Sequence, residues 1–383
     1  MFVHDVLKVI YSPFKGFKEI VSNPKYHGPI LIMILFVATN LAFVYVAVSK
    51  TYFEMSVPEG LELDEWTESE LLWTSNGNKA TSDDHIEGVY YGNKSIEFSI
   101  VNDNHLWMQL DIEERINCSA YGKISFRLKR TWEDTAELES AHVSLYSSEA
   151  DYFQKDIRDD VAIQNASTWN NFTIPTGPTS VGWMNSTDDT DWTNITRVGF
   201  EFTWPQNVTA TIRVEGLFFH GPFRSELGNL TTYLSNFLVF AAMQFTLKWI
   251  ALGGLLFLIS RMLGAKANGK TMLVVAGFTL ITMFFQTVMT TASYAALPTL
   301  YYPFEYLGGV AGEREIAVQT ISEATWLTST IDRYIQIALN IWAVALCSIA
   351  LRTASEFTWQ KSFLISVVAY IASLMIEGLV LGY

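Results

Sequence analysis

Five stretches of the chain are almost continuously apolar, and each is close to the length needed to cross a membrane. A helix requires ~20 residues to span ~30 Å of hydrocarbon. The stretches are residues 29–48, 235–260, 271–297, 333–351 and 362–382. The first is not a cleavable signal peptide, because a long polar segment precedes it and no small-residue cleavage site follows. The pattern predicts a polytopic α-helical membrane protein with five transmembrane helices.

The segment between the first two apolar stretches has a different pattern. Short runs such as ISFRLKR and ATIRVEGLFF alternate apolar and polar residues, and Gly, Pro, Asn and Asp separate them. A period of two is typical of strands with one buried face. We therefore expect an all-β sandwich or jelly roll here. Residues 58–86 are acidic and rich in Gly and Asn, and we interpret them as a linker with one short element.

A short amphipathic helix is predicted before the first apolar stretch. Ser12 can cap it, Pro13 can take its first position, and Pro24 ends it. Phe17 and Ile20 fall on its apolar face, together with Phe14 and Val21. A basic amphipathic helix beside a span is expected to lie in the inner membrane interface. The alternative is that this face packs against a soluble partner.

The basic residues near the spans predict the orientation. The N-terminal segment and the loops 261–270 and 352–361 are net basic, whereas the 298–332 loop holds five acids and one base. Under the positive-inside rule, this places the N-terminus in the cytoplasm and the C-terminus outside the plasma membrane. The predicted divisions are a cytoplasmic amphipathic segment (1–28), transmembrane helix 1 (29–48), an extracellular β-sandwich domain with linkers (49–232) and a four-helix remainder of the bundle (233–383).

Eight N-x-S/T sequons support this orientation, since all of them lie in the segment assigned to the outside. They are Asn93, Asn117, Asn165, Asn171, Asn185, Asn194, Asn207 and Asn229. One sequon is weak evidence, but eight in one region predict N-linked glycans on an exported domain. The chain has only two cysteines, Cys118 and Cys347, so no disulfide framework is available. Many sequons without bridges favour an archaeal cell surface.

The charge belongs mainly to the same segment. Residues 51–230 hold 12 Lys+Arg and 30 Asp+Glu, which excludes nucleic acid as an expected partner. No P-loop, HExxH, nucleophile elbow or dinucleotide fingerprint is present in the sequence. We therefore expect a protein that is not an enzyme.

The opening of the chain carries a family resemblance. The string YSPFKGFKEIVSNPKYHGPILIMILFV resembles the start of Yip1-domain membrane proteins, with the pattern falling on Pro13, Phe17, Ile20, Pro24 and Pro29. The resemblance covers residues 1–48 and 233–383, and it implies a five-helix bundle with a cytoplasmic N-terminus. This chain departs from the family by a large insert after the first span, so trafficking roles of other members are not transferred.

The end of the outer segment carries a second resemblance. DWTNITRVGFEFTWPQNVTATIRVEGLFF is similar to the last strands of galactose-binding-like jelly rolls, with matches that include Trp192, Gly199 and Phe200. The resemblance implies carbohydrate or protein binding and one structural calcium ion, with Glu215 at the position of an acidic ligand. One carboxylate is not a site, because calcium takes six to eight oxygen ligands.

Two ionisable residues lie inside predicted spans. Lys248 is in the second and Glu377 in the fifth, where such groups are costly and usually face the bundle interior. We predict that they pair. Further polar residues that can hydrogen-bond between helices are Gln244, Gln286, Gln336 and Asn340. These residues either hold the bundle together and contact another membrane subunit, or line a path for an ion or proton.

The outer segment also offers aromatic candidates for a ligand. Trp192 and Trp204 lie within strand patterns and are expected in the core, whereas Trp169 and Trp183 lie in loop-like contexts and can stack on a sugar. The six histidines are scattered without i,i+4 pairing, so we expect surface or core histidines rather than metal ligands.

The sequence thus predicts a non-enzymatic membrane scaffold or accessory subunit of a cell-surface complex. Its expected partners are the lipid bilayer, other membrane or envelope proteins, and glycans bound by the β-sandwich. A transport component that uses the intramembrane polar residues is the alternative hypothesis. A third is a carbohydrate-active enzyme, which requires a close pair of carboxylates.

Overall fold

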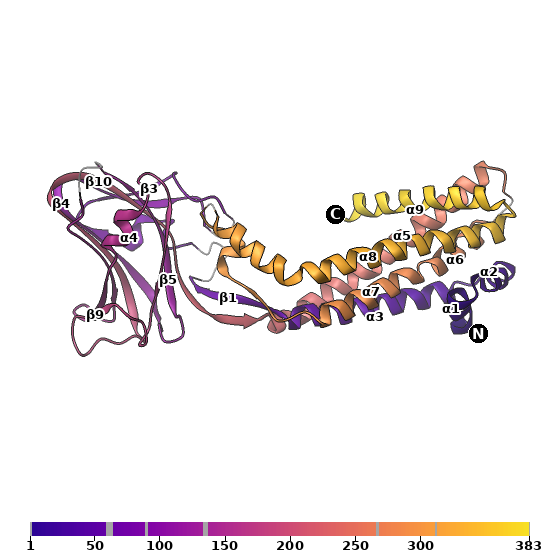
Figure 1. Ribbon diagram of the computed structural model, residues 1–383, viewed down its shortest axis with the longest axis horizontal. Helices are drawn as coiled ribbons and strands as arrows, with labels where there is room; N and C mark the ends of the chain where they lie inside the picture. Colours follow the sequence, from indigo (N-terminus) through magenta and orange to yellow (C-terminus); the bar gives the residue numbers. More distant parts are fainter. Residues whose placement is uncertain are drawn as a thin grey trace. The chain divides into compact units, whose positions relative to one another are not determined.

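The computed structural model describes residues 2–58, 64–88, 91–132, 137–265, 268–310 and 312–382. The chain forms two compact units, a helical unit and a β unit (Figure 1). The helical unit comprises Met1–Thr51, Ser225–Leu300 and Glu323–Tyr383, and the β unit comprises Tyr52–Arg224 and Tyr301–Ser322.

Five helical segments among the described residues are long and apolar enough to cross a membrane, which confirms the predicted number. They are α3 (His27–Ser49), α5 (Leu230–Met262) with the short 3₁₀ helix η2 (Glu226–Asn229), α6 (Gly269–Thr279) with α7 (Ile281–Ala295), α8 (Glu313–Ser355) and α9 (Trp359–Leu381). The predicted span 271–297 is interrupted at Leu280, where α6 ends and α7 begins.

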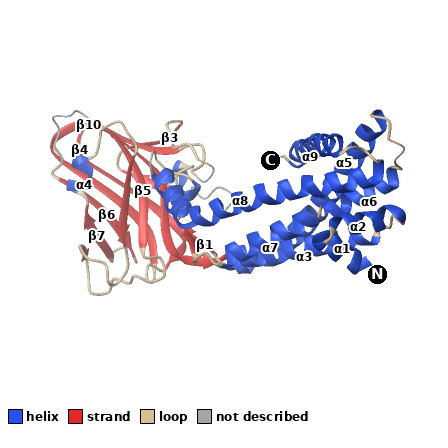
Figure 2. Cartoon of the chain, turned by 45° about the vertical axis from the view of Figure 1, so that its right-hand side comes forward, coloured by secondary structure: helices blue, strands red, loops and turns tan. Residues whose placement is uncertain are grey.

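Helices α3 and α5 lie side by side, and each contacts further helices of the bundle (Figures 1 and 2). Helix α3 also packs against α7, and α5 packs against α6 and α9. Small residues allow some of these close contacts. A Cβ atom on Gly277 would come within 2.5 Å of Pro29, so only glycine fits at this helix crossing.

The N-terminal segment corrects part of the prediction. Helix α2 (Pro13–Ser22) begins at Pro13 as expected, but the Ser12 side chain makes no capping hydrogen bond. Helix α1 (Phe2–Tyr11) precedes it and was not predicted. Phe17 and Ile20 are buried in the same apolar core as the transmembrane helices. Part of the apolar face of α2 therefore packs on its own bundle, whereas Phe14 on the same predicted face is 55% exposed, and a position in the inner membrane interface stays a prediction.

The β unit contains a single 11-stranded sheet. Its strands are β1 (Thr51–Val57), β2 (Trp73–Ser75), β3 (Asn78–Ser82), β4 (Ser95–Ile116), β5 (Lys123–Thr131), β6 (Ser140–Tyr146), β7 (Tyr152–Asp156), β8 (Asn170–Pro175), β9 (Trp183–Asn185), β10 (Ile195–Ser225) and β11 (Leu300–Tyr302). Among the described residues, the short helices η1 (Glu70–Leu72) and α4 (Arg158–Ile163) lie between strands, and η3 (Phe304–Leu307) follows β11.

Two long strands fold this sheet over on itself. Strands β4 and β10 pair antiparallel along most of their length, with register shifts between Thr203 and Ala210. On one side of this bend, β6 and β2 join the pair, and on the other side β5 and β3 join it. Phe126 on one layer meets Phe200 on the other, with ring centroids 4.9 Å apart. The predicted β-sandwich is therefore confirmed (Figure 2).

Two segments predicted as linker and loop are structured parts of the β unit. In the predicted linker, Trp66 and Trp73 are buried in the sandwich core, because their apolar area outweighs the acidic residues around them; residues 59–63 lie outside the described residues. The predicted loop 298–332 instead contains β11, η3 and the start of α8. Phe304 packs on Phe218 with ring centroids 4.4 Å apart, and Tyr301–Ser322 belongs to the β unit, whereas the rest of the stretch belongs to the helical unit.

Candidate functional site

An ion pair lies inside the helical unit, as the sequence predicts. Lys248 Nζ of α5 is 3.0 Å from a carboxylate oxygen of Glu377 in α9, and the two side chains are 8% and 4% exposed. The Gln244 amide donates a hydrogen bond of 2.8 Å to the same carboxylate. The Tyr370 hydroxyl donates to Asn340 at 2.8 Å. These contacts satisfy two charges where solvation by water is weak.

A hollow of about 470 Å³ opens beside this pair. Helices α3, α5, α7, α8 and α9 line it, and the polar lining residues are Asn40, Gln244, Lys248, Gln286, Thr287, Thr290, Asp332, Gln336, Asn340 and Glu377. Asp332 accepts a hydrogen bond from Thr290. Every intramembrane polar residue singled out from the sequence lies on this hollow. Asn40, Thr290 and Asp332 were not predicted, since their neighbours in sequence give no sign of a shared cavity.

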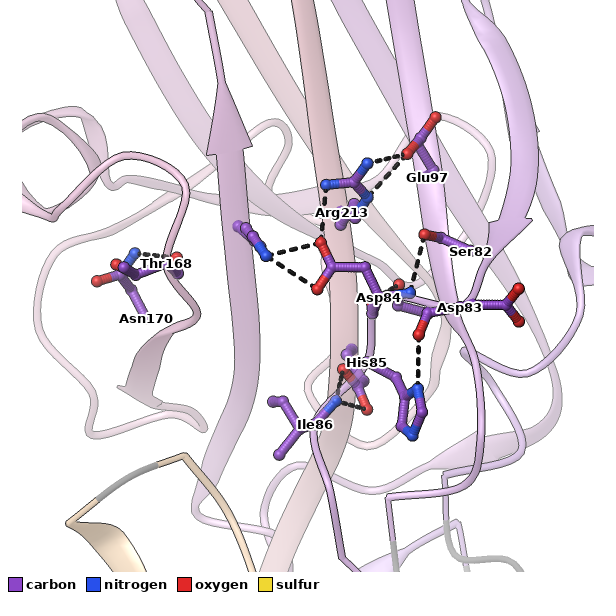
Figure 3. A network of polar contacts seen from close by, with 12 residues as sticks. Ser82, Asp83, Asp84, His85, Ile86, Glu97, Thr168, Asn170 and Arg213 are labelled. Atoms are coloured by element: carbon purple, nitrogen blue, oxygen red, sulfur yellow. Dashed lines mark hydrogen bonds and ion pairs between the residues drawn. The ribbon is translucent and has the colours of Figure 1, made fainter.

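A second polar site lies in the core of the β unit, around Glu215 of β10. The Glu215 side chain is buried and accepts from the Ile86 N–H, with distances of 2.8 and 2.6 Å to its two oxygens. Asp64 is also fully buried and accepts from the Gly216 N–H at 3.0 Å. Figure 3 shows the residues that hold the loop before Ile86. Arg213 of β10 donates there to both Asp84 and Glu97.

Burial changes the protonation of these two carboxyl groups. Loss of solvation raises the pKa of Glu215 to about 10, with the Ile86 N–H opposing the shift and Asp64 adding to it. Burial likewise raises the pKa of Asp64 well above its usual range. The predicted calcium ligand is therefore a neutral acid at neutral pH. Among the described residues, no group of three potential metal ligands includes Glu215, and calcium binding there stays a prediction.

The raised pKa of Glu215 predicts a pH-dependent stability. Between pH 4.5 and about 10 the unfolded carboxyl loses its proton while the folded one keeps it, so the free energy of unfolding falls as pH rises. The slope is about 1.4 kcal/mol per pH unit, or about 3 kcal/mol from pH 5 to pH 7. Glu215→Gln should remove this component, and unfolding followed by tryptophan fluorescence at several pH values measures it. Glu113→Gln, at an exposed position, is the matched control, and equal pH profiles for both variants would contradict the prediction.

The two tryptophans proposed as ligand contacts are both half-buried. Trp183 lies in strand β9 and not in a loop, its indole N–H donates to the Pro175 carbonyl at 2.8 Å, and its ring meets Trp192 edge-on. Trp169 packs beside the apolar cluster around Phe218. Trp204 is fully buried, as expected. Sugar stacking on Trp169 or Trp183 stays a prediction.

A larger hollow on the β unit combines acidic and aromatic side chains. It encloses about 750 Å³, and its lining includes Trp66, Tyr121, Glu65, Asp111 and Glu113. Carboxylates and aromatic faces are the groups that bind hydroxyl-rich ligands or cations. The sequence did not reveal this hollow, because its lining comes from the segment interpreted as a linker and from strand β4.

The eight sequons occupy two kinds of environment. Asn93, Asn117, Asn165, Asn185, Asn207 and Asn229 are exposed. Asn171 is half-buried with its carbonyl oxygen enclosed, and the half-buried Asn194 amide donates to the Ser147 carbonyl at 3.1 Å. A glycan needs a free amide nitrogen and space beside it.

The exposed Asn229 amide donates to Glu226 at 3.1 Å, so we expect glycan occupancy at the other five exposed sequons to exceed that at Asn171 and Asn194. Glycopeptide mass spectrometry on protein from native membranes measures this directly. Equal occupancy at all eight would show that folding does not limit attachment, and sugar outside residues 93–229 would overturn the predicted orientation.

One histidine missed by sequence reasoning lies in a charged cluster. His220 is buried, and its ring approaches Glu54 of β1 and Glu305 of η3. Burial alone would raise the pKa of Glu54, but His220, the Phe304 N–H and Lys123 together lower it to about 2. Glu54 is therefore an anion. No local motif could have indicated the cluster, since its members are distant in sequence.

The fold and these sites define a multi-pass membrane protein that carries a β-sandwich domain. The chain belongs to the Yip1 domain family, whose model matches residues 180–380, more than half of its length. The N-terminal motif that carried the resemblance lies outside the matched range. No curated protein matches this chain.

Several solved structures that are similar to part of this chain are carbohydrate-binding modules. A family 11 carbohydrate-binding module from Clostridium thermocellum, in complex with a β-1,3-1,4-mixed-linked tetrasaccharide, shares 16% identity over 41% of this chain and 93% of its own, with a TM-score of 0.29. A second structure of a family 11 module comes from a cellulosomal cellulase of the same organism. It shares 17% identity, the match covers 44% of this chain and 95% of that module, and the TM-score is 0.28.

Proposed function

We propose that this protein is a non-enzymatic membrane scaffold, an accessory subunit of a cell-surface complex, whose outer domain binds a partner protein, a glycan or an envelope component. The observation that carries the proposal is a stretch of α8 that its own chain covers only in part. From Glu323 to Ile341 no residue is buried, although the following turns of α8 are packed in the bundle core.

The side chains on this stretch favour a protein neighbour over lipid alone. Trp326 and Tyr334 are 60% and 70% exposed, and Ile337 and Ile341 are also exposed. Arg333 is exposed among them. Lipid solvates the apolar side chains well but not the polar ones, and a neighbouring subunit can satisfy both.

Photo-crosslinking in the native membrane tests this directly. A photoreactive residue at Trp326 or at Tyr334 should form an adduct with one protein that also co-purifies in fixed ratio in mild detergent. The matched controls are Met375 and Leu379 of α9, which are 70% and 87% exposed and carry no polar neighbour of this kind. Crosslinking at α8 that is no stronger than at α9 would contradict the scaffold proposal.

The outer hollow lined by Trp66 and Tyr121 is the place we propose for the ligand of the β unit. Acidic residues at its rim suit hydroxyl groups of a glycan, and the half-buried Tyr121 ring provides an apolar face, whereas Trp66 forms part of the buried floor. Glycan-array binding by the full chain in nanodiscs tests it, with Tyr121→Ala expected to abolish binding. The exposed Val181→Ala, outside the hollow, is the control. Equal binding by the two variants would place the ligand elsewhere.

The polar hollow in the helical unit supports a second candidate, a transport component. Ten polar side chains around about 470 Å³ in a membrane-spanning bundle are unusual for packing alone. Purified protein in liposomes should then conduct protons or alkali cations. Lys248→Ala with Glu377→Ala should abolish the flux, and Gln286→Leu should reduce it without breaking the ion pair. Unchanged flux in a folded Gln286→Leu variant would exclude the route.

A further inference from the structure

Three potential metal ligands converge in the β unit from three separate segments. Glu54 lies in β1, His220 lies near the end of β10, and Glu305 lies in η3. One ligand atom of each side chain lies within 4.8 Å of the other two. Strands β1 and β10 are neighbours in the sheet, which fixes two of the three positions.

The His220 ring is oriented as a ligand. It is 1% exposed, and its Nε2 lies 2.6 Å from Ser125 Oγ. Arg127 donates to the same hydroxyl oxygen at 3.2 Å, and the second lone pair of this oxygen can accept from Nε2–H in the tautomer that leaves a lone pair on Nδ1. Metal-binding histidines usually donate their other ring N–H in this way, because it leaves a lone pair on the ligating nitrogen.

The other ring nitrogen has no hydrogen-bond partner. His220 Nδ1 is enclosed, and it lies 3.6 Å from Glu54 Oε2, which is longer than a hydrogen bond. An oxygen of Glu305 lies within 4.8 Å of the ligand atoms of Glu54 and His220, and no hydrogen bond to its side chain is seen among the described residues. A lone pair and two carboxylates that face one another repel unless a metal cation or a proton lies between them.

The remaining contacts support a built site. Glu54 is 4% exposed and is held by Lys123 at 2.9 Å and by the Phe304 N–H at 2.9 Å, each on a different oxygen. The Phe304 ring meets the His220 imidazole edge-on at 5.5 Å and closes the apolar side. Lys123 compensates only one of the two carboxylates, so the cluster keeps a net negative charge.

We propose that Glu54, His220 and Glu305 bind one divalent metal ion of the zinc class. One imidazole nitrogen and two carboxylate oxygens suit such borderline ions, whereas calcium prefers six to eight oxygens. Bonds of about 2.0–2.2 Å place ligand atoms about 3.5 Å apart. His220 and Glu54, whose ligand atoms are 3.6 Å apart, are already near this spacing, so the half-exposed Glu305 in its short helix is the group that closes the site. The ion ties η3 to strands β1 and β10.

The full-length protein in detergent, stripped with a chelator, allows a direct test. On addition of Zn²⁺ we expect one equivalent bound per chain by elemental mass spectrometry, and Co²⁺ should give visible d–d absorption. Glu305→Gln and His220→Ala should each weaken binding at least tenfold, and Zn²⁺ should raise the Tm of the wild type but not of Glu305→Gln. The control is His105→Ala, which removes the surface His105–Glu201 pair of 2.8 Å and should change nothing.

Glu305→Gln keeps the proposal testable even if His220→Ala fails to fold, because it removes no hydrogen bond seen among the described residues. Metal that stays bound at one equivalent in a folded Glu305→Gln variant would place the ion elsewhere and overturn the proposal. No bound metal in the wild type, with an imidazolium at His220 detected by NMR, would show that a proton occupies the position and would overturn it equally.

Discussion

Replacing Lys248 with methionine is expected to destabilise the helical unit by about 3–5 kcal/mol, the range for removal of one partner of a buried ion pair. The substitution preserves the length of the side chain but leaves the Glu377 carboxylate, 4% exposed, without a cation. Gln244 still donates to that carboxylate at 2.8 Å, but an amide cannot replace a positive charge at 3.0 Å. Unfolding in SDS mixed micelles, followed by helical circular dichroism, measures the loss.

The double variant Lys248→Met with Glu377→Gln distinguishes the ion pair from simple packing. Both residues are then neutral, and the glutamine can still bond to Gln244, so most of the stability should return. Lys361→Met is the control, since this lysine lies at the start of α9 and donates to the Leu263 carbonyl near the helix ends. Its loss should cost at most about 1 kcal/mol. A double variant as unstable as the single one would mean that Lys248 acts by packing alone.

The features that could be predicted from the sequence are those encoded by local patterns. Apolar stretches gave the five spans because lipid imposes a minimum length on each of them. The Lys248–Glu377 pair was predictable because two isolated charges in hydrocarbon have few ways to be satisfied. Period-two alternation indicated the sandwich, since each strand of a sandwich has one buried face.

The features that could not be predicted depend on partners distant in the chain. Residues 64–82 look like a linker because acids dominate them, yet Trp73 supplies a core ring against Phe98 and Phe200. The first half of α8 looks like a loop because polar residues interrupt it, and its helical state follows from hydrogen bonding rather than burial. The cluster of Glu54, His220 and Glu305 depends on the register of two strands and on the position of η3.

Both units place charge in their interiors and compensate it with a specific partner. In the helical unit the partner of Lys248 is Glu377, and in the β unit the partner of Arg127 is Glu313. The second pair joins strand β5 to the first residue of α8, within the β unit. Such a pair costs desolvation energy but selects one arrangement of the segments, because any other leaves a buried charge alone.

Arg127→Met is accordingly expected to destabilise the β unit by about 3–5 kcal/mol. The Arg127 side chain is fully buried and donates to both oxygens of Glu313 at 3.0 and 3.2 Å, and to the Gly216 carbonyl at 3.0 Å. Methionine fills part of the space but leaves the carboxylate and the carbonyl without these donors. Glu313 also accepts from the Val310 N–H at 2.7 Å, so the loss should extend to the segment that ends at Val310.

Hydrogen exchange by mass spectrometry on the full chain locates this effect. Peptides from residues 301–310 should exchange faster in Arg127→Met, whereas peptides from β6 and β7 should keep their protection under conditions where the protein stays folded. The matched control is Arg197→Met, which breaks a surface pair with Asp111 of 2.6 Å and should cost at most about 1 kcal/mol. The prediction would be contradicted if Arg127→Met cost as little stability as Arg197→Met and left the exchange of residues 301–310 unchanged. The apolar contact of Phe304 with Phe218 would then be sufficient to hold this segment.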